Sequence, residues 1–199
     1  MLVIHVGQIA TVFVMGSSLA FEKKFRGEKL FQNPARRLGA KLFLYTMFEM
    51  SVMAVCLAIA LKFFGLVCRG NPFEILILVA AYVFCVIAFG LLMGALVREP
   101  YHAITWSLFY VMPSVLFAGA IWSRTSMDNV SLVLSYIMPI GYAANDLRSL
   151  FVKGSAVGIE LRLLGLLIMG AIFFAAAIHF LEANKFANDN AQRTHAVDA

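Results

Sequence analysis

The sequence predicts an all-α integral membrane protein with about five transmembrane helices. Of its 199 residues, 62% are hydrophobic and only 14% are charged, whereas a soluble domain has roughly 25% charged residues. The apolar residues gather in blocks, several of which exceed the ~18 residues that mark a spanning helix. The basic residues instead concentrate between the first two blocks, in residues 22–41. These observations exclude a water-soluble core.

The apolar blocks are near or above the ~20 residues needed to cross the hydrocarbon. The first block has no basic residue ahead of it and a basic segment after it, so a span is favoured over a cleaved signal peptide. We expect a transmembrane domain over residues 1–182, followed by a polar, disordered cytoplasmic tail at 183–199. The expected spans are about 2–21, 42–67, 73–97, 103–122 and 159–181.

Residues 22–41 set the expected orientation, because they contain seven Lys or Arg residues against two Glu residues. Nucleic-acid binding is one explanation of such a cluster. In so apolar a chain, the excess of basic residues in cytoplasmic loops explains it better. We therefore expect a multi-pass protein of the cell inner (cytoplasmic) membrane with its N-terminus outside, its C-terminus inside and no nucleic-acid partner.

Residues 123–158 break the pattern of long apolar blocks. Within them, residues 130–140 are moderately apolar but too short to cross the bilayer. Irregular backbone at membrane depth must be covered by protein or by water. We expect a short re-entrant or interfacial element on the outer face.

Two features inside the predicted spans point to contacts between helices. Glu49 lies about 10 Å deep at ~1.5 Å per residue, where a carboxylate costs on the order of 3 kcal/mol. It must face the protein interior, face a water-filled path or be protonated. A packing hydrogen bond is favoured over a role in coupled proton transfer. Gly90 and Gly94 have the G-x-x-x-G spacing that predicts close helix packing.

Catalytic motifs are missing from the sequence. It contains no phosphate-binding glycine loop with its lysine, no H-E-x-x-H, no G-x-S-x-G and no paired carboxylates. We therefore expect no catalytic, cofactor-binding or metal-binding residues, and no nucleotide hydrolysis by this chain. Energy for any active transport must come from another subunit.

Residues 113–154 carry short motifs in a fixed order, which resembles the C-terminal signature of ABC-2 type permeases, the membrane half of ATP-driven exporters. The basic segment is similar to the family's charged segment after an early span, where a coupling helix docks on the ATPase. The motifs are Pro113-Ser114, Ala118-Gly119, Ser135-Tyr136 through Pro139, and Leu147-Arg148 through Lys153-Gly154.

This resemblance implies two sets of functional residues. The ATPase-coupling set is Glu22, Phe25, Gly27, Leu30, Phe31 and Pro34, and the outer-gate set is Pro113, Gly119, Tyr136, Pro139 and Arg148. It also implies a separate ABC ATPase subunit that binds ATP and Mg, and a second permease chain in a homodimer or heterodimer.

The function implied by the resemblance is export of a hydrophobic or lipid-like substrate by alternating access. The resemblance implies that the chain corresponds to roughly the C-terminal half of a six-span permease and starts at the second span. A truncated product, a wrongly placed start and one piece of a split permease are all open explanations. The alternative function is a non-transporting assembly or regulatory subunit, or a truncated permease remnant.

Overall fold

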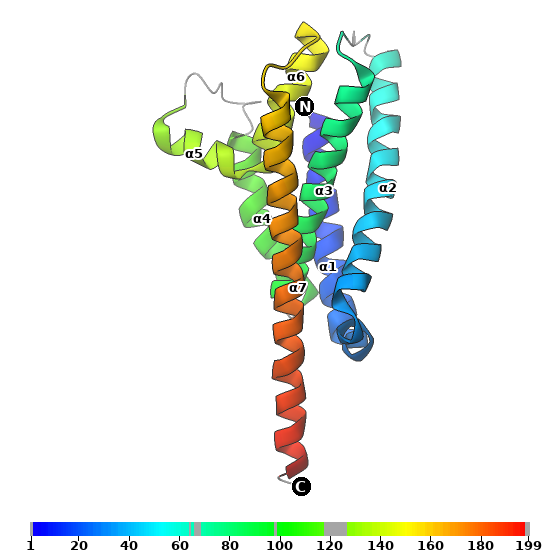
Figure 1. Cartoon of the computed structure of the whole chain (residues 1–199), viewed down its shortest axis with the longest axis vertical. Helices are drawn as coiled ribbons and strands as arrows, with labels where there is room; N and C mark the ends of the chain where they lie inside the picture. Colours follow the sequence, from blue (N-terminus) through cyan, green and yellow to red (C-terminus); the bar gives the residue numbers. More distant parts are fainter. Residues whose placement is uncertain (1, 64, 66–68, 98, 118–126, 198–199) are drawn as a thin grey trace.

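The computed structural model describes residues 2–63, 65, 69–97, 99–117 and 127–197 (Figure 1). These residues form helices without any strand, so the predicted all-α class is confirmed. The helices are α1 (Leu2–Gln32), α2 (Pro34–Phe63), α3 (Pro72–Leu96), α4 (Pro100–Phe117), α5 (Asn129–Ile137), α6 (Pro139–Lys153) and α7 (Ile159–Val197).

Helix α3 is the centre of the bundle, because α1, α2, α4, α6 and α7 all contact it. The predicted close packing at its two glycines is confirmed. A Cβ atom added at Gly90 would lie 2.7 Å from Met15 Cβ, and one at Gly94 would lie 2.7 Å from the Gly16 carbonyl oxygen. Only glycine at these positions allows α1 to approach α3 so closely.

Among the described residues, three helices are long and apolar enough to cross a membrane: Pro34–Phe63, Pro72–Leu96 and Ile159–Asn184. Helices α1 and α4 are not among them, so the expected count of five spans is not confirmed. Both helices carry polar side chains that are buried against other helices. The buried polar residues are Gln8 and Thr11 in α1, and Ser107 and Ser114 in α4.

The basic segment is more helical than expected. The backbone stays helical through Gly27 to Gln32, bends at Asn33 and becomes helical again at Pro34. Proline is well tolerated at the first position of a helix, where its missing N–H has no intrahelical partner to lose. The segment is therefore the junction of two long helices, and no separate short helix is present in it.

The structure contains two further helical stretches that the sequence analysis did not predict. The expected disordered tail continues α7 as far as Val197, because no Gly or Pro follows Gly170 and Ala, Glu, Lys and Gln are good helix formers. Helix α6 begins at Pro139 and ends at Gly154, whose φ of +81° and N–H bond to the Leu150 carbonyl make a left-handed cap.

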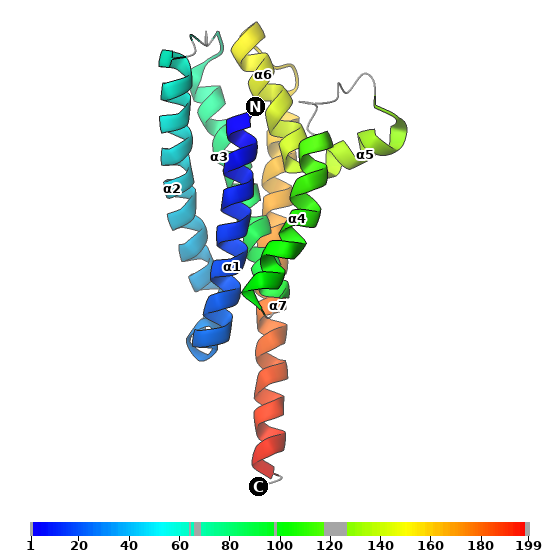
Figure 2. The same cartoon turned by 180° about the vertical axis from the view of Figure 1, so that it is seen from behind.

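The helix ends and the connections between helices lie at two opposite ends of the bundle. Figures 1 and 2 show the α1–α2 junction and the α3–α4 turn at the end opposite the N-terminus, with α7 extending beyond them. The sequence predicts the same grouping for the basic segment, the turn near residue 98 and the tail. The cytoplasmic location of this end stays a prediction.

Candidate functional site

An exposed aromatic pair lies at the start of the predicted coupling segment. Phe21 and Phe25 are 56% and 64% exposed, although their ring centroids are only 4.5 Å apart. They lie on the last turns of α1 that have described side chains, close to Glu22, Lys23 and Lys24. An exposed apolar patch rimmed by charges is typical of a protein or membrane contact site.

Ion pairs connect the base of α1 to its neighbours. The Glu22 carboxylate accepts from Lys41 Nζ at 2.6 Å and lies 3.7 Å from Arg37 Nη1, which joins α1 to α2. Lys24 Nζ donates to Glu99 at 2.7 Å, which joins α1 to the α3–α4 turn. Each exposed pair contributes roughly 0–1 kcal/mol. Together they fix the register of the junction against α3.

One backbone oxygen receives two side-chain donors at this end. The carbonyl of Ala95, in the last turn of α3, accepts from Lys23 Nζ at 2.8 Å and from Asn184 Nδ2 at 3.2 Å. The last carbonyls of a helix have no intrahelical partner and carry a partial negative charge. A lysine and an amide satisfy this one, so α1, α3 and α7 meet at a single atom.

The predicted coupling residues have different places at this end. Glu22 and Phe25 lie on α1, Gly27 lies in its helical backbone, and Pro34 opens α2. Leu30 and Phe31 lie in α1 as well, with side chains outside the described part of the structure. Glu22 makes the ion pairs above, while Phe25 is exposed.

Glu49 faces α1, so the expectation that it points into the protein holds. A Cβ atom at Gly7 would lie 2.9 Å from Glu49 Oε1, which places the carboxylate directly against the α1 backbone. Among the described residues, no three of His, Cys, Asp or Glu lie together as a metal site would require.

A chain of buried hydrogen bonds connects α3, α1 and α4. The Tyr82 hydroxyl donates to Gln8 Oε1 at 3.1 Å, and Gln8 Nε2 donates to Ser114 Oγ at 3.4 Å. Ser114 Oγ in turn donates to the Val111 carbonyl at 2.6 Å. Sequence reasoning missed this network, although a single amide at Gln8 within an apolar block was a usable signal.

The predicted outer-gate residues do not form one cluster. Pro113 lies inside α4, which continues to Phe117. Pro139 is the first residue of α6 and is buried. Arg148 lines an apolar cavity of about 370 Å³ between α2, α3 and α6, away from α4 and α5. Tyr136 lies in α5 with its side chain outside the described residues, and Gly119 lies outside them altogether.

An ion pair at the end of the bundle opposite the α1–α2 junction was also missed. Arg162 Nε donates to the buried Asp146 carboxylate at 2.6 Å, and Arg162 Nη2 donates to the Val157 carbonyl at 2.6 Å. The two charged residues are sixteen positions apart, so only the reversal between α6 and α7 brings them together. The pair fixes the end of the last long helix against α6.

Comparison with known proteins gives concordant matches. A family model described as ABC-2 type transporter matches residues 1–152. Over 138 residues the chain is 26% identical to the probable multidrug ABC transporter permease YbhS of Escherichia coli (strain K12), which covers 69% of this chain and 37% of that protein. Over 115 residues it is 26% identical to the linearmycin resistance permease protein LnrN of Bacillus subtilis (strain 168), covering 57% and 30%. The chain thus spans about a third of the length of these curated relatives. No solved structure matches it.

Proposed function

Because this chain belongs to the ABC-2 type transporter family, we propose that it is a permease subunit of an ATP-driven exporter. In this proposal a separate ATPase subunit binds ATP and Mg and hydrolyses the nucleotide. A second permease chain completes the transport pathway. The complex moves a hydrophobic or lipid-like substrate outward across the inner membrane by alternating access.

The observation that carries the proposal is the exposed Phe21–Phe25 pair at the basic α1–α2 junction. Aromatic side chains with charged neighbours are the usual anchors of protein interfaces. We therefore place the ATPase contact on residues 22–38, with Phe25, Leu30 and Phe31 as apolar anchors and with Glu22, Gly27 and Pro34 shaping the junction.

The contacts of this junction suggest how a movement of the ATPase reaches the membrane helices. Glu22 connects the junction to Lys41 of α2, and Lys23 connects it to the Ala95 carbonyl of α3. A displacement of the junction therefore acts on α2 and α3 together. We assign Pro113, Tyr136, Pro139 and Arg148 to the outer gate, together with Gly119, which is assigned from its sequence motif alone.

The test is a pull-down from detergent-solubilised membranes of the native host. Phe25, Leu30 and Phe31 are changed to Asp in one sample, and the exposed Val157 and Leu161 at the opposite end are changed to Asp as a matched control. We expect an ATPase to co-purify with the wild type and with the control, and to be lost from the Phe25, Leu30 and Phe31 variant. Absence of an ATPase from all samples would support the alternative, a non-transporting subunit or permease remnant.

A further inference from the structure

The cavity between α2, α3 and α6 has the composition of a lipid site. Its volume of about 370 Å³ lies within the ~300–1,000 Å³ of typical ligand sites. Its wall is formed by methionine, leucine, isoleucine, valine and alanine side chains, with Arg148 as the one charged residue among those that line it.

The length of the cavity matches one leaflet of a bilayer. Its α2 wall runs from Met50 to Ala60, about 15 Å at ~1.5 Å per residue. This is half of the ~30 Å hydrocarbon thickness. The wall begins near the outer end of α2 and reaches the middle of the helix, so an acyl chain of a single leaflet fits along it.

Arg148 lies at the mouth of the cavity without an acidic partner among the described residues. The arginine of α7 at this end, Arg162, is paired with Asp146 at 2.6 Å. The acidic residues Glu74 and Glu160 lie at this end too, but neither lines the cavity. The Arg148 side chain is therefore available to an anionic group outside the protein.

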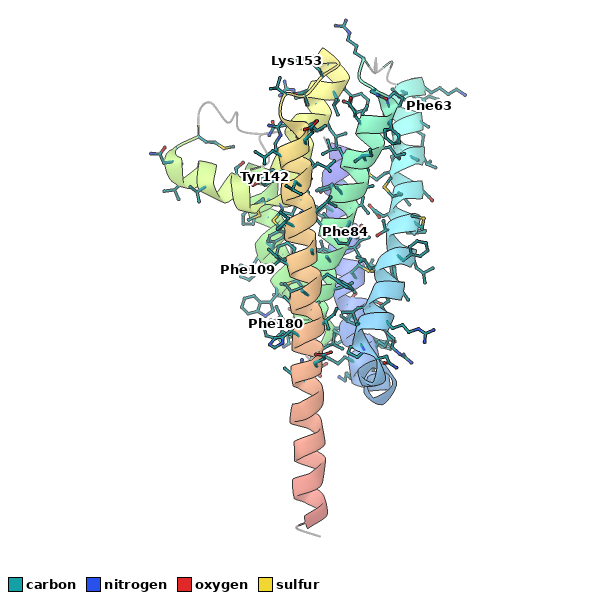
Figure 3. The ribbon with its side chains drawn as sticks, viewed as in Figure 1. Phe63, Phe84, Phe109, Tyr142, Lys153 and Phe180 are labelled. Carbon is teal, nitrogen blue, oxygen red and sulfur yellow. The ribbon has the colours of Figure 1, made fainter. Side chains whose placement is uncertain are left out.

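Further basic residues lie at the same end of the molecule. The N–H of Arg69 donates to the carbonyl of Phe151, whose side chain lines the cavity. Lys153 is exposed on the last turn of α6, and Figure 3 shows it at the same end of the molecule as Phe63, the last residue of α2. Basic residues are normally enriched at the cytoplasmic end, so a group of them at the opposite end calls for an anionic partner there.

We propose that this cavity binds one anionic phospholipid of the outer leaflet, with its acyl chain between α2 and α3 and its phosphate at Arg148. An arginine suits this role because its planar guanidinium donates two parallel hydrogen bonds to phosphate oxygens. Basic pockets between membrane helices bind anionic headgroups in the same way. The site needs no ATPase, so it stands or falls independently of the proposed function.

The experiment uses the full chain in nanodiscs of phosphatidylglycerol and phosphatidylcholine at equal amounts. Native mass spectrometry then measures which lipid stays bound to the released protein. We expect the wild type to retain phosphatidylglycerol in preference to phosphatidylcholine by about fivefold, the effect of one basic residue near an anionic lipid. Equal retention of the two lipids would overturn the proposal.

Two variants test the headgroup contact and the acyl-chain contact of the lipid. We expect Arg148→Gln to remove the preference, and Ala60→Trp, which fills the cavity, to reduce bound phosphatidylglycerol to the level of phosphatidylcholine. Arg36→Gln, which removes an exposed arginine at the opposite end, should leave the preference unchanged. Size-exclusion profiles check that each variant is folded.

Two results for these variants would refute the site. One is an unchanged preference in folded Arg148→Gln and Ala60→Trp proteins. The other is a loss of chain dimerisation in Ala60→Trp without any loss of phosphatidylglycerol, because the cavity would then be an interface between two copies of the chain.

Discussion

Helices α2 and α3 are neighbours in sequence and are both long and apolar, yet their surroundings differ sharply. Of the most apolar stretch of each helix, 67% is buried in α3 and 11% in α2. Helix α3 contacts five other helices, whereas α2 turns large side chains such as Phe43, Phe48 and Val55 outward. In a bilayer these outward side chains face lipid or another subunit.

The difference shows that hydrophobicity does not select the central helix of a membrane bundle. Lipid tails are as apolar as leucine, so no hydrophobic force drives one apolar helix onto another. What selects α3 is the close approach allowed by Gly90 and Gly94, together with the hydrogen bond from Tyr82 to Gln8. Helix α2 has Gly39, but nothing lies within 4 Å of a Cβ atom there.

The sharpest test of this comparison is the same substitution in the two helices. Gly94→Leu forces side-chain atoms into the Gly16 carbonyl and Leu19, so we expect a destabilisation of about 3 kcal/mol, the upper part of the overpacking range. Gly39→Leu meets open space and replaces glycine by a better helix former, so we expect no loss and a gain of up to ~1 kcal/mol. Unfolding in mixed detergent micelles measures both, and equal losses would contradict the comparison.

A smaller effect is expected from truncating one phenylalanine in each helix. Phe89 stacks on Tyr110 with ring centroids 3.8 Å apart and contacts Phe173 at 5.4 Å. Phe89→Ala therefore leaves a cavity, and we expect a loss of about 2–3 kcal/mol, below the soluble-protein range because lipid also solvates the ring. Phe48 is 66% exposed on α2. Phe48→Ala should therefore lower the free energy of unfolding of the monomer by less than ~0.5 kcal/mol. A similar loss at both positions would mean that α2 is packed as tightly as α3.

The buried amide of α1 tests the polar part of the comparison. Gln8→Leu leaves the Tyr82 hydroxyl unpaired, and we expect a loss of about 1–2 kcal/mol. The double variant Gln8→Leu with Tyr82→Phe should lose less than the sum of the single variants, because no unpaired hydroxyl remains at residue 82. Additive losses in the same unfolding assay would show that the two side chains do not interact.

The smallest effect concerns α5, a short helix stabilised at its start by Asp128. Hydrogen bonds from Ser131 hold the pKa of the exposed Asp128 carboxyl below its ordinary value. Its stabilisation is therefore complete above the unfolded pKa of ~3.9 and is lost as the pH falls through the lower folded pKa. Amide hydrogen exchange in α5, corrected for intrinsic rates, should rise over that acidic window. In Asp128→Asn, which keeps a capping oxygen that does not titrate, the rise should be absent.

The sequence predicted features that depend on local composition. The apolar blocks predicted the all-α membrane class, and the spacing of Gly90 and Gly94 predicted their close contact. The sequence did not predict features that depend on partners far away along the chain. Asp146 and Arg162 look like ordinary polar residues until α6 and α7 reverse, and Gln8 acquires its role only when α3 brings Tyr82 beside it.

The helix boundaries were predicted less well, for an energetic reason. The basic stretch after Phe21 and the tail after Leu181 are polar, and polarity was taken as a sign of loop or disorder. Both contain good helix formers, and the basic stretch has two glycines, Gly27 and Gly39, each with a cost of about 1 kcal/mol that a long helix tolerates. Polarity marks where a helix leaves the membrane, and the helix itself continues beyond that point.

The shared oxygen of Ala95 has a consequence for biosynthesis. It lies at the end of α3, yet one of its two donors, Asn184, belongs to α7, which is made well after α3. A protein is synthesised from its N-terminus, and its early elements begin to pack before the later ones exist. The Lys23 bond can therefore form first, while the second bond must wait until α7 has left the ribosome and entered the bundle. Completion of this end is thus a later step than the packing of α1 on α3, because it requires α7 in the bundle.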